Sequence, residues 1–130
     1  MTYYYNLYPR RHRHMNRPEA NGQDFEYRLP VNVREDEDTY ALSAIVPGLT
    51  ADDLEIEVIE DVITIKGEYK SEDSNLLLNE LPSGKFQRSL RMPAELDANR
   101  AEAELKNGLL TVRVPKAEHV LPKQIKVSVN

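Results

Sequence analysis

Few side chains in this sequence belong to the types that carry catalytic chemistry. The histidines are His12, His14 and His119, and the first two lie in a stretch without a regular apolar period. The spacing of His12 and His14 would hold a metal only weakly, and a solvated basic segment is the preferred interpretation. No cysteine occurs, which excludes a thiol nucleophile, a disulfide and a cysteine-ligated zinc site. We therefore expect no catalytic residue, no cofactor and no metal site.

The carboxylates are numerous, but their placement indicates a solvated sheet face. Glu55 and Glu57 alternate with Leu54, Ile56 and Val58, which is the period of a half-buried strand. The five glycines are isolated and are expected at turns, so no glycine-rich phosphate loop is present. The sequence therefore argues against an enzyme.

Charge is unevenly distributed along the 130 residues. Residues 1–28 hold five arginines against three acidic residues, a net charge of +2, whereas the remainder carries a net charge of −7. An acidic body argues against nucleic acid as a partner, because such binding depends on neutralising phosphates with basic side chains. The run from Arg10 to His14 can contact an anion, although contact with the protein's own acidic body is the preferred interpretation.

Residues 1–28 predict an N-terminal arm. The arm begins with an aromatic cluster formed by Tyr3, Tyr4, Tyr5, Leu7 and Tyr8. Tyrosine joins a large apolar ring to a polar tip, which suits adaptable contacts. Two interpretations stay open: the cluster contacts unfolded partner proteins, or it packs inside an oligomer of this chain. The arm has no apolar core of a secretory signal, and no apolar stretch approaches the ~20 residues of a membrane span, so we expect a cytoplasmic protein without a transmembrane segment.

From residue 30 onward the sequence changes to the pattern of β-strands. Val31 and Val33 alternate with polar neighbours, and further strands are expected at 39–46, 54–59, 62–66, 86–91, 101–105 and 109–114. Asn107-Gly108 supplies the positive φ values of a tight hairpin turn, and the short connection Glu60-Asp61 predicts a second hairpin. Short strands separated by frequent turns predict an all-β fold, an antiparallel sandwich.

Two linked motifs stand in the second half of the chain. The first is Gly84-x-Phe86-x-Arg88 followed by Met92-Pro93, and the second runs from Ala103 through Asn107-Gly108-Leu109-Leu110 to Pro115-Lys116. In this order and spacing they resemble the α-crystallin domain of small heat-shock proteins. The resemblance covers roughly residues 30–116 and divides the chain into an arm at 1–28, an α-crystallin domain at 29–116 and a C-terminal extension at 117–130.

The resemblance implies an immunoglobulin-like sandwich with a flexible arm at each end, which forms dimers and larger oligomers. It implies an ATP-independent chaperone that holds unfolding client proteins. Arg88 then corresponds to the arginine that pairs with carboxylates near the dimer interface.

The tail Ile125-x-Val127 resembles the family's C-terminal anchor. Two β-branched side chains two residues apart point the same way from an extended segment, which can add to a sheet edge. The alternative is a last strand of the same domain. The resemblance places the receiving groove between the strands at 54–59 and 101–105. Its expected apolar floor consists of Leu54, Ile56, Val58, Ala103 and Leu105.

Two segments do not follow the strand pattern clearly. In many relatives the region 68–83 carries a strand exchanged between protomers, but only sixteen residues separate Gly67 from Gly84, so Leu76–Leu78 are instead expected to extend the strand near Lys85. The segment from Asp97 to Ala103 is either one helical turn or a loop.

Two other functions remain open at this point. A co-chaperone or scaffold module of the related CS type also gives a strand-rich single domain, but it would lack the tail anchor and the Phe86-x-Arg88 pattern. A purely structural oligomer without client activity would use the same apolar surfaces.

Overall fold

The structure of the protein is a computed structural model that describes residues 4–5, 27–70, 75–123 and 125–129. The strands are β1 (Tyr4–Tyr5), β2 (Asn32–Glu35), β3 (Thr39–Ile45), β4 (Leu54–Ile59), β5 (Val62–Tyr69), β6 (Gly84–Arg91), β7 (Glu102–Lys106) and β8 (Leu109–Pro115). Three short 3₁₀ helices accompany them: η1 (Ala51–Asp53) between β3 and β4, η2 (Ala98–Arg100) between β6 and β7, and η3 (Glu118–Val120) after β8. The prediction of an all-β fold is confirmed.

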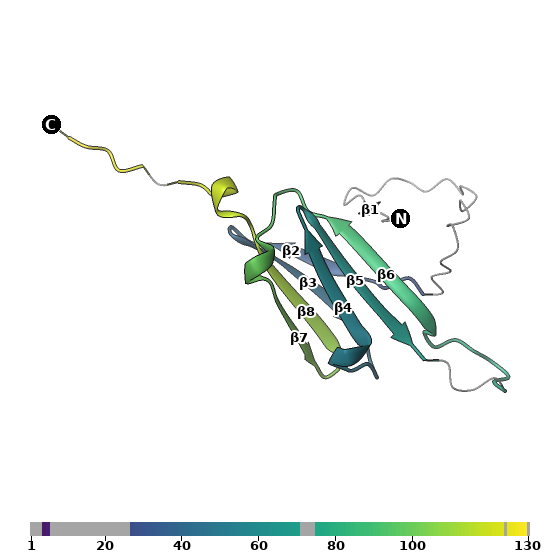
Figure 1. Ribbon diagram of the computed structural model, residues 1–130. Coiled ribbons are helices and arrows are strands. Elements are labelled where there is room, and N and C mark those ends of the chain that lie inside the picture. The colour runs from purple at the N-terminus through teal and green to yellow at the C-terminus, as the bar shows by residue number, and fades with distance from the viewer. Residues whose placement is uncertain (1–3, 6–26, 71–74, 124, 130) are drawn as a thin grey trace.

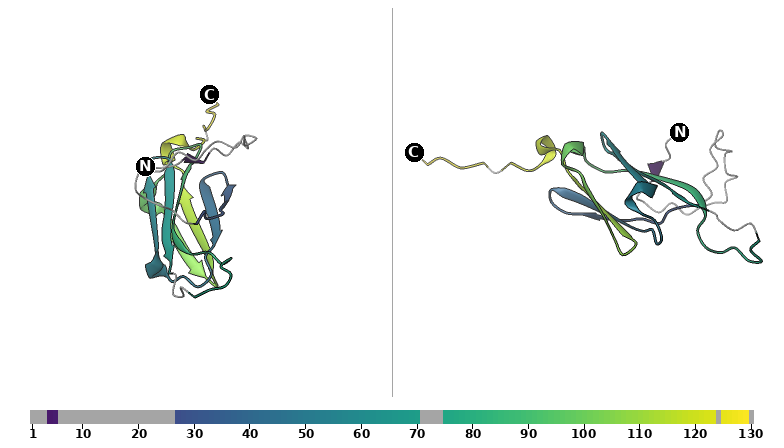
Figure 2. Two further views of the ribbon diagram at one scale, coloured as in Figure 1. Left: turned by 90° about the vertical axis from the view of Figure 1, so that its right-hand side faces the viewer. Right: turned by 60° about the horizontal axis from the view of Figure 1, so that its bottom comes forward.

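The strands form two four-stranded sheets that pack face to face (Figures 1 and 2). One sheet has the order β1-β6-β5-β4 and the other has the order β2-β3-β8-β7. Neighbouring strands are antiparallel, except that β1 pairs parallel with β6. The result is the antiparallel sandwich that the sequence predicted.

The core lies between the two sheets and follows the alternation of the sequence. Every second residue of a central strand points inward, as in β3, where Tyr40, Leu42 and Ala44 are buried. The other large buried side chains include Ile63 and Ile65 of β5, Phe86 and Leu90 of β6, and Leu110, Val112 and Val114 of β8. Burying each such side chain contributes roughly 1.5–3 kcal/mol, so this layer is the main source of stability.

Both predicted hairpins are present. Asn107 and Gly108 have φ values of 51° and 75° in the turn between β7 and β8, as a type I′ turn requires. In the turn between β4 and β5, Glu60 has a φ of 55°. The carbonyl of Gly108 accepts a hydrogen bond from the amide of Val46 at 2.7 Å, which ties the β7–β8 turn to the end of β3.

The segment that links β5 and β6 differs from the prediction. Leu76–Leu78 do not extend β6, because that strand begins at Gly84 and residues 75–83 have no strand structure. Leu76, Leu77 and Leu78 are 52%, 105% and 72% exposed. These leucines do not pair with β5 or β6, and they are not buried in the core of their own chain.

Two smaller features refine the prediction. The segment after Asp97 forms the helical turn η2, whose first amide groups are capped because the Asp97 side chain accepts a hydrogen bond from the Asn99 amide. The two-residue strand β1 lies inside the predicted arm. A strand of two residues carries no sequence period, which is why the alternation could not reveal it.

The side of the sandwich between β6 and β2 is closed by the chain that enters β2. Leu29 is fully buried, and its carbonyl accepts a hydrogen bond from the Arg88 guanidinium at 2.7 Å. Tyr27 lies beside this closure, with its ring 5.7 Å from that of Tyr69 and 6.1 Å from that of Phe86 in edge-on geometry. These contacts bring the edges of β6 and β2 to one side of the molecule.

Candidate functional site

The opposite side of the sandwich is bordered by the terminal strands of both sheets, β4 and β7. Because β6 and β2 share one side, the strand orders place β4 and β7 together on the other. We call this region the β4–β7 edge and define it by the five predicted groove residues: Leu54, Ile56, Val58, Ala103 and Leu105.

The strand register shows which way these five side chains point. On β4, Ile56 lies opposite Ile65, which is fully buried in the core. On β7, Leu105 lies opposite the buried Leu110. Directly opposite residues of an antiparallel pair share one face of the sheet, and Leu54, Val58 and Ala103 follow the same alternation. The structure therefore brings all five predicted residues to the inner face of the two terminal strands.

Burial differs along this edge. Leu54, Ile56, Val58 and Leu105 are partly buried and pack against the core. Ala103 faces inward but is exposed, because its methyl group is too small to close the space beside it. Four of the outward positions carry glutamates, at 55 and 57 on β4 and at 102 and 104 on β7, and the last outward position of each strand carries Ile59 or Lys106. The β4–β7 edge is thus an incompletely closed apolar strip with an acidic rim.

The C-terminal extension begins from a fixed root. The amide of Ala117 donates to the carbonyl of Glu95 at 2.9 Å. The imidazole Nε2 of His119, in η3, lies 2.8 Å from a carboxylate oxygen of the same glutamate. These two contacts hold the start of the extension against the loop between β6 and β7 and set the direction in which it leaves the domain.

Beyond this root the tail projects away from the sandwich (Figure 1). Ile125, Val127 and Val129 are 87%, 86% and 92% exposed, and residues 125–129 form no strand with the described part of the chain. The alternative that the tail is a last strand of its own domain is therefore wrong for these residues. An exposed aliphatic pair and an incompletely closed apolar edge occur in one chain without meeting each other.

Arg88 lies on β6 between Phe86 and Leu90, which are 1% and 2% exposed. Its side chain is half-buried on the same inner face, because every second residue of a strand points to the same side of the sheet. Within the chain one of its partners is the carbonyl of Leu29. A role at a dimer interface remains a prediction.

The predicted client-binding cluster falls almost entirely outside the described residues. Tyr3, Leu7 and Tyr8 are not described, and for Tyr4 and Tyr5 only the backbone of β1 is. That backbone runs beside β6, where Tyr4 lies opposite Ser89 and Tyr5 opposite Leu90.

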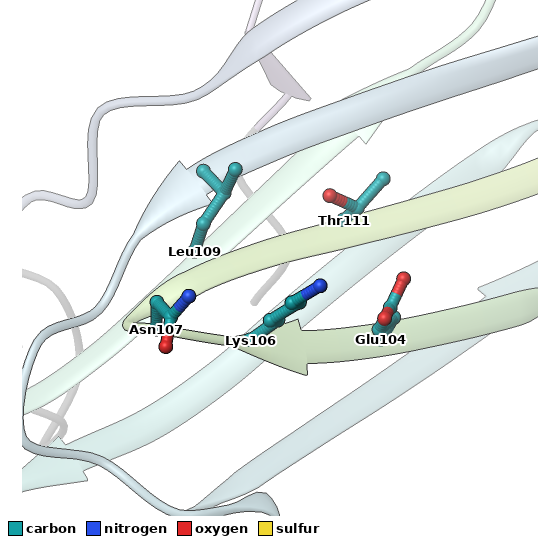
Figure 3. Close-up of a pocket in the computed structure, with 5 residues that line it drawn as sticks. All are labelled: Glu104, Lys106, Asn107, Leu109 and Thr111. Atoms are coloured by element: carbon teal, nitrogen blue, oxygen red, sulfur yellow. The ribbon is translucent and has the colours of Figure 1, made fainter.

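A shallow hollow lies on the outer face of β7 and β8 (Figure 3). It is lined by Glu104, Lys106, Asn107, Leu109 and Thr111, whose side chains rise from the two strands and their turn. These groups lack a nucleophile paired with a base. In the described part of the chain, histidine and acidic side chains do not gather in any group of three or more that could hold a metal ion.

Sequence reasoning missed one polar network at the end of β2. The Glu35 carboxylate accepts hydrogen bonds from the Lys116 ammonium at 2.9 Å and from the Tyr40 hydroxyl at 3.2 Å. The lysine also lies 5.1 Å from the centre of the Tyr40 ring. The Lys116 hydrogen bond lowers the pKa of Glu35, and the same bond raises the pKa of Lys116. The two charges stand 81 residues apart, so no local pattern could have paired them.

The fold and the two linked motifs agree with one known family. The sequence model of the Hsp20/alpha crystallin family matches residues 32–130. The chain belongs to the Hsp20/alpha crystallin family. The match includes both strands of the β4–β7 edge and the tail that carries Ile125 and Val127.

Individual relatives agree with this assignment. Heat shock protein 16 of Schizosaccharomyces pombe is 35% identical over 108 residues, which are 78% of this chain and 76% of the relative. Small heat shock protein C4 of Rickettsia felis is 31% identical over 102 residues, 75% of this chain, and the chain spans 63% of that relative's length. The solved structure of heat shock protein 16.0 from Schizosaccharomyces pombe has a TM-score of 0.65 at 32% identity, over 81% of this chain and 98% of that one.

A small heat-shock protein from Xylella fastidiosa has a TM-score of 0.64 at 28% identity, over 79% of this chain and 98% of that one.

Among the described residues, helices are too short and too polar to cross a membrane.

Proposed function

We propose that this chain is an ATP-independent holdase, a chaperone that binds unfolding proteins and keeps them from aggregating. Membership of the Hsp20/alpha crystallin family supports a chaperone role. The observation that carries the proposal is the pairing of an exposed aliphatic tail with an incompletely closed apolar edge in one chain. Such surfaces are complementary between copies, and the same surfaces are apolar enough to receive a client.

In this proposal, the tail of one subunit adds to the β4–β7 edge of a neighbour and places Ile125 and Val127 over its inner face. Burying two aliphatic side chains contributes roughly 3–6 kcal/mol before the cost of ordering the tail. One tail therefore binds weakly, and many tails bind together by avidity. A weakly bound tail dissociates readily and exposes the β4–β7 edge to clients.

Three further parts belong to the same proposal. Arg88 contributes to the contact within a dimer, and dimers assemble into larger oligomers. The N-terminal cluster of Tyr3, Tyr4, Tyr5, Leu7 and Tyr8 contacts clients. The acidic body, with its net charge of −7 outside the arm, keeps complexes soluble. The protein acts in the cytoplasm, and neither a nucleotide nor a nucleic acid takes part.

Light scattering of a heat-labile enzyme such as citrate synthase tests this function. The enzyme is heated with and without an equimolar amount of this protein, in the absence of ATP. We expect scattering to be suppressed, and lysozyme at equal mass serves as the control for nonspecific crowding. Unchanged scattering at equimolar protein would remove the holdase proposal.

A further inference from the structure

Strand β6 borders its sheet along most of its length. Its inner neighbour is β5, and on the other side β1 pairs with it only at Ser89 and Leu90. Since β6 has eight residues, the remaining positions on that side have no strand neighbour among the described residues. We call this the β6 edge.

The hydrogen-bond register identifies the backbone groups that the β6 edge presents. The amide of Met92 donates to the carbonyl of Asp61 at 2.7 Å, which continues the β5–β6 register by one pair. Bonded pairs alternate along an antiparallel ladder, so the residues at 86, 88 and 90 also bond to β5. The residues between them direct their amides and carbonyls to the β6 edge: Lys85, Gln87, Ser89 and Arg91.

The β6 edge differs from the other three edges of the sandwich in its length and in the sign of its charges. Strands β2, β4 and β7 have four, six and five residues, and each carries at least one glutamate. Short length and charge are the usual means by which edges resist further pairing. Strand β6 is longer than all three, and its charged side chains are all basic. The edge therefore repels basic segments, whereas uncharged and acidic segments can pair with it.

The segment that pairs with the β6 edge shows what kind of chain it accepts. Strand β1 approaches in parallel orientation and pairs at two positions. The first seven residues carry no charged side chain and include three tyrosines. Parallel pairing is slightly weaker per residue than antiparallel pairing, and a pair of two residues offsets little ordering entropy. A longer segment that pairs along the whole edge would displace it.

We infer that the β6 edge is a strand-addition site for unfolded clients, and that β1 occupies it in the resting chain. The ligand is an extended, uncharged or acidic polypeptide segment, since the edge itself is flanked by Lys85 and Arg91. Main-chain hydrogen bonds supply the affinity, which makes the site tolerant of client sequence. Displacement of β1 by the client at the same time releases the N-terminal tyrosines. This inference rests on the proposed holdase function.

A second copy of β6 fits the same edge poorly. An antiparallel pairing of two β6 strands centred on Arg88 would place Lys85 of each copy opposite Arg91 of the other. Like charges directly opposite each other destabilise a cross-strand pair. A client segment without basic residues meets no such repulsion.

The experiment uses the full chain and reduced, carboxymethylated α-lactalbumin, an unfolded acidic polypeptide, as the probe. Residue-resolved hydrogen exchange is measured with and without the probe. We expect exchange at the amides of Lys85 and Gln87 to slow by about fivefold or more. The amides of Phe86 and Arg88, which face β5, should not change. Equal exchange at Lys85 and Gln87 with and without bound probe would overturn the inference.

A pair of variants gives a second readout. Gln87→Pro removes one edge amide without touching the β5 ladder, a position that tolerates proline, and Gln87→Ala keeps the amide. We expect Gln87→Pro to weaken probe binding by roughly tenfold, or ~1.4 kcal/mol, and Gln87→Ala to stay within about twofold. Circular dichroism confirms that both fold.

The outcomes separate this inference from the proposed function. Full client protection by Gln87→Pro would overturn strand addition and leave the holdase function standing. A loss of dimers in Gln87→Pro, seen by sedimentation while Gln87→Ala stays dimeric, would show that the edge joins subunits and would also overturn the inference. If the wild-type chain suppresses no aggregation, the proposed function itself fails.

Discussion

Arg88 shows how one residue serves its own chain as well as a predicted interface. Its guanidinium reaches the carbonyl of the fully buried Leu29 at 2.7 Å and so holds the segment that closes the β6–β2 side. Arg88→Ala leaves this carbonyl without that donor. We expect a loss of about 1.5–3 kcal/mol in the free energy of unfolding, the range for hydrogen bonds to charged groups, measured by urea denaturation.

Sedimentation of the same variant tests the dimer role separately. If Arg88 also pairs with carboxylates of a partner subunit, the dimer should weaken beyond what the loss of stability explains. Arg88→Lys is the matched control, since it keeps the charge but not the planar fork. A variant that is less stable but dimerises like the wild type would restrict Arg88 to its own chain.

Gly67 is a second residue whose identity is set by a single contact. It lies inside β5, and not at a turn as the sequence had predicted for the glycines. It stands opposite Phe86 in the β5–β6 ladder, and a Cβ atom at this position would overlap the Cζ atom of the Phe86 ring. Gly67→Ala should therefore destabilise the fold by about 1–3 kcal/mol, the usual cost of overpacking, in thermal or urea unfolding. In the double variant with Phe86→Leu, the loss in unfolding free energy should be smaller than the sum of the losses of the two single variants. Full additivity would mean that the ring and the alanine do not collide.

The Glu35–Lys116 pair makes stability depend on pH. The pKa of Glu35 is lowered from 4.5, first by its hydrogen bond to Lys116. A lowered carboxyl pKa contributes stability that is present above the unfolded value and lost as the pH falls through the folded one. The unfolding free energy of the wild type should therefore exceed that of Glu35→Gln above about pH 4.5, and the difference should shrink at lower pH.

Urea denaturation between pH 3 and 7 measures this difference. Glu37→Gln is the control, because Glu37 is an exposed carboxylate in the bend between β2 and β3. A difference for Glu35→Gln that stays constant down to pH 3 would contradict the role of the ion pair.

At the scale of elements, substitutions in the tail and in the β4–β7 edge should have the same effect on assembly. Replacing both Ile125 and Val127 by alanine should shift large oligomers toward dimers, as measured by sedimentation, while the sandwich stays folded. Ala103→Gln should have the same effect from the receiving side, because it fills the exposed inner position of β7. Glu104→Gln introduces the same side chain on the outer face and should leave assembly unchanged. Large oligomers in the alanine variant would mean that assembly uses other contacts.

The elements also show what the sequence could and could not predict. Strands with clear alternation, such as Leu54–Ile59, were predicted with their observed bounds, and Asn107-Gly108 located the β7–β8 turn because few residues adopt its positive φ values. The prediction that Leu76–Leu78 extend β6 was wrong. Apolar residues indicate burial, but they do not show whether the burial is in their own chain or against another one. The five predicted groove residues share the inner face because the period of a strand fixes that face.

The rest of the site depends on contacts between distant parts of the chain. The root of the tail rests on Glu95 meeting His119, and the Glu35–Lys116 pair joins the start and the end of the domain. Such pairs follow from the topology of the sandwich and have no local sequence signal. The two-residue strand β1 was missed for the same reason, because its pairing depends on β6 and not on its own pattern.

At the scale of the whole molecule, two groups of exposed apolar side chains lie outside the core among the described residues. These are the leucines of the segment between β5 and β6, and the aliphatic side chains of the tail. Leu77 and Leu81 are 105% and 82% exposed, and a single chain covers neither them nor its tail. A chain that leaves this much apolar surface uncovered is suited to association with other chains, and we propose that copies of itself and unfolded proteins are those partners.

The arm gives the test that separates these two kinds of association. Removing residues 1–24 deletes the tyrosine cluster and the basic run while leaving β2–β8 intact, so the β signature in circular dichroism should not change. Client protection should fall sharply, because the deletion removes the aromatic side chains that we propose contact clients. Oligomers should become smaller as well if the arms pack together, and a smaller oligomer alone alters the exposed surface.

Replacing Tyr3, Tyr4, Tyr5 and Tyr8 by serine separates the two losses, because the length and the charge of the arm are kept. The backbone of β1 can still pair with β6 in this variant, since strand pairing uses main-chain groups. We expect oligomer size in sedimentation to be preserved and suppression of light scattering to be weakened, because the tyrosine rings no longer contact the client while the β6 edge still can. Protection equal to or greater than that of the wild type would refute client contact by the tyrosines and assign that contact to the edges of the sandwich.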